Sequence, residues 1–262
     1  MWDAIIISPF INILMFIYHY LGQNFGIAII LFTILIRLLT HPLMVKQIKG
    51  AQAMQDMQKD KRYVDLQTKY KGDKEKLQQE QAKLIQELGV NPFASCLPTI
   101  IQFPIIIGLY QAIIASMASG PVELLNLSKH IYPWLLDVSK LMPINNNFLW
   151  MELSQPERLI IPGLGFGIPV LTIIVVATSY LQSKLSMPPA TDPNDASAKT
   201  SSMMTIMMPL MMGWISYTLS SGLALYFVIS NVVGIGQYAL LGKLNWDNLI
   251  PGRKPKAIIK KK

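Results

Sequence analysis

The stretch 22–43, GQNFGIAIILFTILIRLLTHPL, is apolar for long enough to cross a lipid bilayer, which takes about 20 residues. It nevertheless contains Arg37 within the apolar run. A charged side chain at the centre of a membrane costs roughly 3 kcal/mol on insertion scales. Two arrangements would relieve that cost: the side chain extends to the nearer headgroup layer, beside the basic segment that begins at Lys46, or it faces a water-filled cavity.

The composition around this stretch is that of a membrane protein. Of 262 residues, 52% are hydrophobic and only 15% are charged, whereas soluble domains average about 25% charged residues. The net charge of +8 favours anionic lipid headgroups or RNA-bearing machinery as partners. Cys96 is the only cysteine, which excludes an internal disulfide and a cysteine-based metal cluster.

Four further apolar segments are long enough to be membrane spans. Together with the first span at 21–43, they predict an all-α polytopic membrane protein with five transmembrane helices. The last two are joined by only Ser220, Ser221 and Gly222, which predicts an antiparallel pair. The four segments are 97–118, 159–180, 203–219 and 223–241.

The segments between the spans differ in composition. Residues 1–20 are apolar but contain Pro9, Asn12 and His19, which predicts an interfacial amphipathic helix. The alternative is that they extend the first span. Residues 44–91 are rich in Lys, Gln, Asp and Glu, with apolar residues at three- and four-residue steps and a break at 71–73. This pattern predicts a helical hairpin.

The distribution of charge predicts the topology. The hairpin contains ten Lys or Arg, the loop 181–202 contains Lys184 and Lys199, and the tail 242–262 is basic. Residues 1–20 contain no Lys or Arg, and the loop 119–158 contains three against four acidic residues. By the positive-inside rule, the N-terminus and 119–158 are extracytoplasmic, and the hairpin, the loop 181–202 and the C-terminal tail are cytosolic.

The five predicted spans contain no Asp or Glu. Ion-coupled transporters generally need intramembrane carboxylates or paired charges, so this class is disfavoured. The chain also has no P-loop, HExxH or Gly-x-Ser-x-Gly motif. We therefore expect no catalysis, no cofactor and no metal.

Without an acidic partner, Arg37 must meet water, carbonyl groups or neutral polar side chains. A polar, positively charged cavity follows if several of these face one side, although Gln102 and Asn231 are alternatively interhelical hydrogen bonds that hold the bundle together. The fourth span contains MMTIMMPLMM at 203–212, which suits the reception of varied apolar segments or a lipid-facing helix. The candidate partners of Arg37 are Thr33, Gln102, Thr172, Ser216, Tyr217, Tyr226 and Asn231.

Three stretches in order resemble the YidC family of membrane protein insertases. They are ILIRLLTHPL, which ends at Leu43, LGVNPFASCLPTIIQFPIIIGLY at 88–110, and MMPLMMGWISYTLSSGLALYFVISNVVGIGQ at 207–237. With the charged hairpin, the resemblance covers nearly the whole chain from residue 3. It implies a five-helix bundle with a polar groove that is open to the cytosol and to lipid. The chain resembles a short bacterial form without a large extracytoplasmic domain.

The resemblance also implies roles for individual residues. Arg37 would be the groove arginine and Gln102 the glutamine of the second span. From the polar candidates above, we expect Thr33, Ser216 and Tyr217 to line the same groove. Phe227 stands where some members have Tyr, and the basic tail is short. The residues expected to contact the apolar part of a substrate are Ile105, Ile106, Met208, Pro209, Tyr226 and Phe227.

The implied function is insertion and folding of newly made membrane proteins without nucleotide hydrolysis. The implied partners are nascent membrane proteins and the lipid bilayer, with the ribosome and the Sec translocon as further candidates and no small-molecule substrate. A bacterial plasma membrane is the expected location. The alternatives from other classes are a small channel or transporter, which an inverted repeat would favour, and a structural assembly factor.

Overall fold

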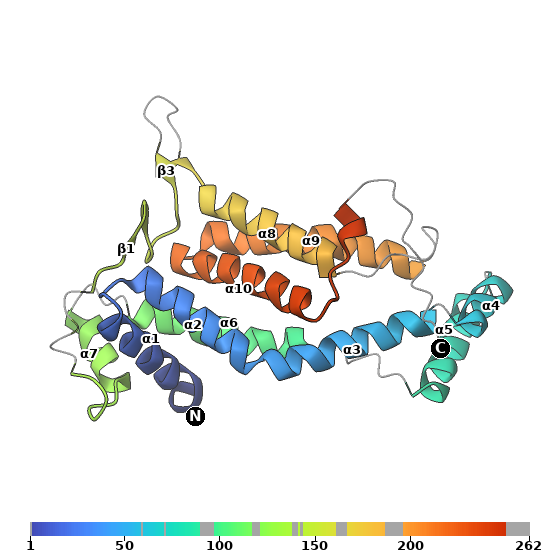
Figure 1. The fold of residues 1–262 in the computed structure, drawn as a ribbon, viewed down its shortest axis with the longest axis horizontal. Coiled ribbons are helices and arrows are strands. Elements are labelled where there is room, and N and C mark those ends of the chain that lie inside the picture. The colour runs from blue at the N-terminus through green and yellow to red at the C-terminus, as the bar shows by residue number, and fades with distance from the viewer. Residues whose placement is uncertain are drawn as a thin grey trace.

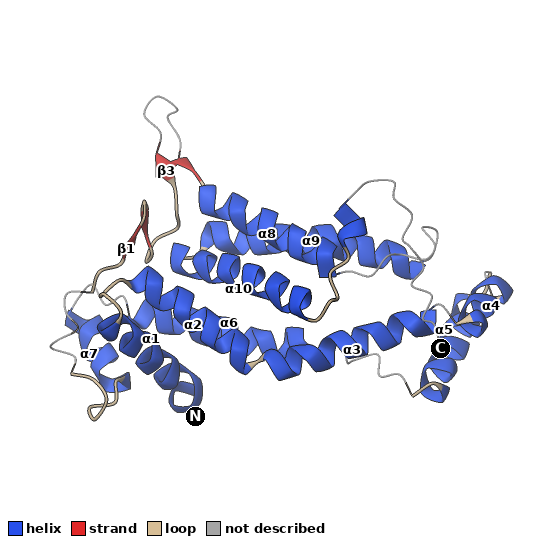
Figure 2. Ribbon diagram, viewed as in Figure 1, coloured by secondary structure: helices blue, strands red, loops and turns tan. Residues whose placement is uncertain are grey.

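The structure, a computed structural model, is predominantly helical and forms two layers of helices with a helical arm at one end (Figure 1). Among the described residues, strands form only two short antiparallel pairs (Figure 2). The structure describes residues 2–58, 60–70, 72–89, 97–116, 121–137, 141, 144–160, 167–186 and 196–249.

The first layer contains the N-terminal helices and α6. A short π-helix, η1 (Asp3–Ile7), continues into α1 (Ser8–Tyr20), and α2 (Phe25–Leu39) follows after a tight turn. Gly22 adopts φ +86° in that turn, a conformation that L side chains rarely adopt. The side chain of Asn24 accepts a hydrogen bond from the Ile27 amide and so caps α2. Helix α6 (Leu97–Ser116) packs against η1 and α1.

The second layer contains α8 (Val170–Ser186), α9 (Ala196–Thr218) and α10 (Ser221–Leu240). Helix α10 packs on both α8 and α2, and so joins the two layers (Figure 1). A Cβ atom at Gly213 of α9 would collide with the side chain of Val176 in α8. Glycine there allows the close approach of these two helices, as small residues do between membrane helices.

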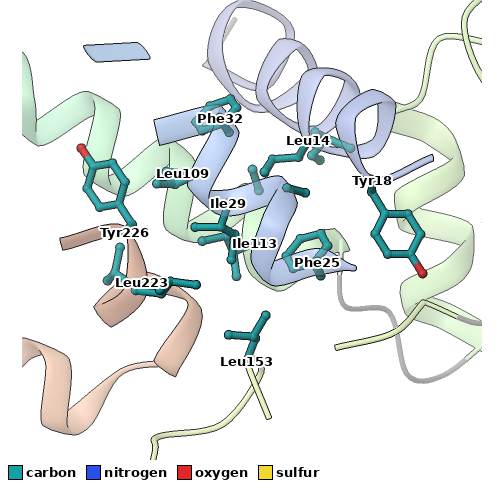
Figure 3. Close-up of a cluster of buried hydrophobic side chains, with 14 of the residues drawn as sticks. Leu14, Tyr18, Phe25, Ile29, Phe32, Leu109, Ile113, Leu153, Leu223 and Tyr226 are labelled. Carbon is teal, nitrogen blue, oxygen red and sulfur yellow. The ribbon is translucent and has the colours of Figure 1, made fainter. Parts of the chain in front are cut away.

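The core lies where the two layers meet. Fully buried side chains from α1, α2, α6 and α10 fill it, and Leu153 enters from the loop side (Figure 3). Residues Ile11, Leu14, Met15 and Tyr18 of α1 are all within this core. Helix α1 is therefore an integral part of the packing, and its predicted interfacial position in a membrane stays a prediction.

The expected third span differs from the structure at its start. It was predicted over 159–180, but residues Leu159–Ile160 (β3) pair with Gly167–Ile168 (β4), and the helix begins only at Val170. Pro169 lacks an amide hydrogen and suits the start of a helix rather than its interior. The span therefore corresponds to α8, which extends six residues beyond the predicted end at Tyr180.

The fourth span also has different bounds, because α9 begins at Ala196, inside the segment expected to be a loop at 181–202. No Gly or Pro interrupts the sequence between Ala196 and Pro209, so a helix can continue beyond the apolar stretch into polar surroundings. Residues 187–195 of that loop and 250–262 of the basic tail lie outside the described residues.

The basic segment forms three helices. Helix α3 (His41–Gln58) continues from α2 at an angle, and α4 (Lys61–Lys69) and α5 (Lys74–Glu87) lie beyond it. Asp60 and Asp73 cap α4 and α5 with their side chains. These helices lie at one end of the bundle, and α7 (Pro121–His130) and the hairpin of β1 (Asn147–Phe148) and β2 (Met151–Glu152) lie at the other (Figure 1).

Among the described residues, two helical segments are long and apolar enough to cross a membrane, Asp3–Tyr20 and Ser221–Leu240. A third candidate is the pair Phe25–Leu39 and His41–Gly50, which is bent by 56°. Gln102–Ser116 and Val170–Ser186 are apolar but shorter. The five-span arrangement stays a prediction.

Candidate functional site

Arg37 lies at the end of α2 and points toward α10. Its Nε donates a hydrogen bond to the hydroxyl oxygen of Ser230 at 2.8 Å, and its Nη2 donates to the same oxygen. No carboxylate forms a salt bridge with Arg37 among the residues that the structure describes. The guanidinium is therefore held by a neutral hydroxyl, as the absence of acidic residues from the predicted spans leads one to expect.

Ser230 belongs to a polar stripe on one face of α10. Tyr226, Ser230 and Gln237 are separated by four and seven residues, and this spacing places them on the same side of a helix. We call these three residues the α10 polar stripe. All three are buried. Buried polar groups need hydrogen-bond partners, and the stripe finds them on neighbouring helices.

Two contacts complete the stripe at its ends. Gln102 of α6 donates from Nε2 to the hydroxyl of Tyr226. Gln237 donates from Nε2 to the backbone carbonyl of Arg37 at 2.9 Å, and the same atom lies 3.2 Å from Nδ1 of His41. The stripe thus joins α10 to α6, α2 and α3 through polar contacts within an otherwise apolar bundle.

The other three predicted groove residues lie elsewhere. Thr33 is fully buried, and its hydroxyl donates to the carbonyl of Ile29 in its own helix at 2.6 Å. Ser216 lies 3.2 Å from the hydroxyl of Thr172 and so links α9 to α8. Tyr217 is exposed, and the guanidinium of Arg158 lies 5.3 Å from the centre of its ring. The structure therefore brings only Arg37 and Gln102 to the α10 polar stripe.

Asn231 faces away from the stripe. Its Nδ2 donates to the hydroxyl groups of Thr178 and Ser179 on α8, at 3.1 and 2.8 Å. This is the interhelical hydrogen bonding that the sequence offered as one of two interpretations. Gln102 likewise makes an interhelical bond, but its partner belongs to the polar stripe.

The residues expected to contact an apolar substrate are mostly turned inward. Tyr226, Phe227 and Pro209 are buried, and Ile105, Ile106 and Met208 are half-buried. Other apolar side chains of the same two helices are exposed. On α6 these include Phe103 and Ile107, and on α9 they include the six residues Met203, Ile206, Met207, Leu210, Met211 and Trp214.

We call the six exposed residues on α9 the α9 outer face. Their spacing of three and four residues puts them along one side of the helix. Trp214 is the most exposed, at 70%. An apolar face of this length has no partner among the described residues, and in a membrane protein it suits contact with lipid or with another apolar helix.

The arm carries a second candidate surface. A cleft of about 330 Å³ lies between α4 and α5, with Leu66 and Leu84 among its lining residues and charged side chains of both signs around them. At one end, hydrogen bonds from Arg62 hold the pKa of the Asp60 carboxyl below its usual value. Because this pair lies at the protein surface, we assign it no role beyond capping α4.

Sequence reasoning missed Ser230 and Gln237. Both lie in the predicted fifth span, and their spacing from Tyr226 would have placed them on one helix face. A helical projection of 223–241 would therefore have shown the stripe, although not which helices it faces. No group of three or more His, Cys, Asp or Glu that could hold a metal occurs within the described part of the chain.

Residues 16–247 match the family model described as 60Kd inner membrane protein. The chain belongs to this family, the YidC family of membrane protein insertases. It is 35% identical over 244 residues to membrane protein insertase YidC 2 of Listeria innocua. That match covers 92% of this chain and 71% of the relative. It is 33% identical over 242 residues to membrane protein insertase MisCA of Bacillus subtilis, covering 92% and 78% of the two chains.

A solved structure supports the same assignment. The chain resembles a crystal structure described as an active YidC insertase with the first transmembrane domain resolved, with a TM-score of 0.55 and 25% sequence identity. The match covers 87% of this chain and 45% of that one. The chain thus spans less than half the length of the chain in that structure.

Proposed function

We propose that this YidC family member inserts newly made membrane proteins into the lipid bilayer and assists their folding. In this proposal the protein moves short hydrophilic segments outward, and the apolar segments of the substrate pass into lipid. Partition of apolar surface into lipid drives the step, at about 25 cal/mol per Å² of area removed from water. No nucleotide is hydrolysed and no covalent bond is made.

One observation carries the proposal. Arg37 is a cation in an apolar helix with a hydroxyl rather than a carboxylate as its partner. Among the described residues no anion neutralises its charge, so it remains available to attract one. Moving an acidic or polar tail out of water costs less free energy beside Arg37 than in lipid. The neighbouring Gln102 and Tyr226 supply further polar groups to such a tail.

The apolar part of the substrate would meet exposed side chains of α6 and α9. Phe103 and Ile107 on α6 and the α9 outer face are apolar and accessible. Methionine side chains are flexible and polarizable, so they adapt to apolar partners of different shape. We propose these exposed residues as the contact surface, with the inward-facing Ile105, Ile106, Met208 and Pro209 supporting it from behind.

The orientation follows from the charges. We propose that the basic helices α3, α4 and α5 lie in the cytosol and that α7 and the β1–β2 hairpin lie outside. The positive-inside rule supports this orientation, because the two groups lie at opposite ends of the bundle. A basic cytosolic arm suits contact with the ribosome, and the Sec translocon is a further candidate partner in a bacterial plasma membrane.

The decisive test is insertion by the protein alone. The protein is reconstituted in liposomes, a single-span substrate with an acidic N-terminal tail is added, and protease protection of that tail is measured. We expect protection with the unmodified protein and a large loss with Arg37→Ala. Asn231→Leu is the matched control, because it removes a polar contact of α10 outside the stripe.

Two outcomes would contradict the proposal. If the unmodified protein protects no tail, insertion by this chain alone is wrong. If Arg37→Ala protects the tail as well as the unmodified protein does, the charge is not needed, and a side chain that extends to the headgroups becomes the better explanation. Passage of small ions through the liposomes would favour the channel or transporter instead.

A further inference from the structure

The helix that carries Arg37 is broken three residues after it. Helices α2 and α3 meet at Thr40 and His41 with a bend of 56°. Pro42 has no amide hydrogen, so it cannot donate the helical hydrogen bond to the residue four positions earlier, and proline commonly bends a helix at this point. A break of this kind leaves backbone carbonyls in need of other donors.

Gln237 donates from another helix to the carbonyl of Arg37, one residue before Leu38, whose carbonyl would pair with the amide that Pro42 lacks. Its Nε2 donates to the Arg37 carbonyl at 2.9 Å and lies 3.2 Å from Nδ1 of His41. The side chain is buried, at 5% exposure. One amide group therefore touches the last turn of α2 and the first residue of α3, on both sides of the bend.

The chemistry of these partners fixes the direction of the amide. The Arg37 carbonyl can only accept a hydrogen bond, so the NH₂ group of Gln237 must face it. The opposite orientation would place Oε1 of Gln237 against the carbonyl oxygen of Arg37, and neither atom can donate a hydrogen bond. In the observed orientation, Oε1 has no hydrogen-bond partner among the described residues. With the NH₂ group in this place, Nδ1 of His41 accepts a hydrogen bond from it in the tautomer that carries the ring proton on Nε2.

We propose that Gln237 is a positioning residue that fixes the bend between α2 and α3. By holding both sides of the break, it sets the direction in which the basic arm leaves the bundle. It also fixes the position of the Arg37 backbone, from which the guanidinium reaches the hydroxyl of Ser230. This inference rests on the proposed function, because Gln237 would position both the arm and Arg37, the two parts to which that function assigns a role.

The bend can be measured directly. Cys96 is the only cysteine, so a Cys96→Ser background allows unique spin labels at Lys49→Cys in α3 and Val232→Cys in α10, both exposed positions. A helix rises about 1.5 Å per residue, so residue 49 lies about 12 Å beyond His41, and a change of about 30° in the bend moves it by about 6 Å. Electron paramagnetic resonance in liposomes resolves such a change.

The test compares Gln237→Met, which keeps the volume and removes the donors, with Asn231→Leu, which removes the contacts of α10 to α8. We expect Gln237→Met to shift or broaden the distance distribution by about 6 Å and to lower tail protection toward that of Arg37→Ala. We expect Asn231→Leu to leave the distances unchanged. An unchanged distribution in Gln237→Met, or an equal change in both variants, would overturn the inference.

A second pair of variants serves if Gln237→Met does not fold. His41→Asn keeps an accepting atom close to the Nδ1 position, whereas His41→Leu removes it. The inference requires a broader distance distribution in His41→Leu than in His41→Asn, and equal distributions contradict it. A shifted distance in Gln237→Met together with no tail protection by the unmodified protein would instead reject the proposed function and leave the role of Gln237 intact.

Discussion

The guanidinium of Arg37 donates two hydrogen bonds to the single hydroxyl of Ser230, a residue 193 positions further along the chain. This contact joins α2 to α10 within an apolar bundle, and a neutral group is the partner of a full positive charge. A carboxylate at the same place would neutralise the arginine. A hydroxyl orients it without neutralising its charge.

Ser230→Ala should lower the stability of the protein by about 2 kcal/mol, because it removes the acceptor from a partly buried charged group. Thermal unfolding in detergent or nanodiscs measures the change. Ser220→Ala is the matched control, since the buried hydroxyl of Ser220 has no partner among the described residues and its loss should be nearly neutral. Equal effects of the two substitutions would show that the Arg37 contact contributes nothing to stability.

Arg37→Lys should keep most of the tail protection for an acidic substrate, whereas Arg37→Gln should lose it. The proposed attraction depends on charge, which lysine retains, although it lacks the planar fork of donors. The difference between the two variants should shrink with a neutral tail and at high salt, which screens exposed charges. If Arg37→Lys is as defective as Arg37→Gln, the geometry of the fork and not the charge is what matters.

A photo-crosslinking amino acid placed at Met207, Met211 or Trp214 should capture substrate during insertion. The same group at Met212 should capture little, because that side chain is half-buried against the core. The measurement is the yield of crosslinked substrate on a gel, normalised to the amount of insertase. A higher yield from Met212 than from the α9 outer face would mean that the substrate enters on the opposite side of the helix.

Glu157→Ala should destabilise the protein by about 2 kcal/mol. This buried carboxylate accepts hydrogen bonds from Nε1 of Trp150 at 2.9 Å and from the amide of Leu171 at 3.0 Å, near the start of α8. Glu152→Ala is the control, because Glu152 is exposed and should change stability by less than about 0.5 kcal/mol. Chemical unfolding followed by tryptophan fluorescence compares the two, and similar losses would argue against a capping role.

Several features were predictable because they depend on residues close together in the sequence. The apolar run around Arg37 and the turn between α9 and α10 follow from local composition and from a short connection. The break between Leu39 and His41 differs from the single span predicted over 21–43. The family was predictable too, because three motifs occur in order along the chain, and the comparisons confirm it. The predicted start of the third span at residue 159 was wrong. Apolar composition alone does not distinguish a helix from the short paired strands at 159–160 and 167–168.

The sequence by itself determined the class of protein, the position of a lone arginine in an apolar helix and the absence of acidic residues from the predicted spans. Only the tertiary structure decided which polar side chains meet that arginine. Thr33 is four residues from Arg37 but bonds to its own helix, whereas Ser230 and Gln237 are far away in sequence and reach it. The reason is physical: a helix fixes which face a side chain occupies, but the packing of one helix on another fixes what that face meets.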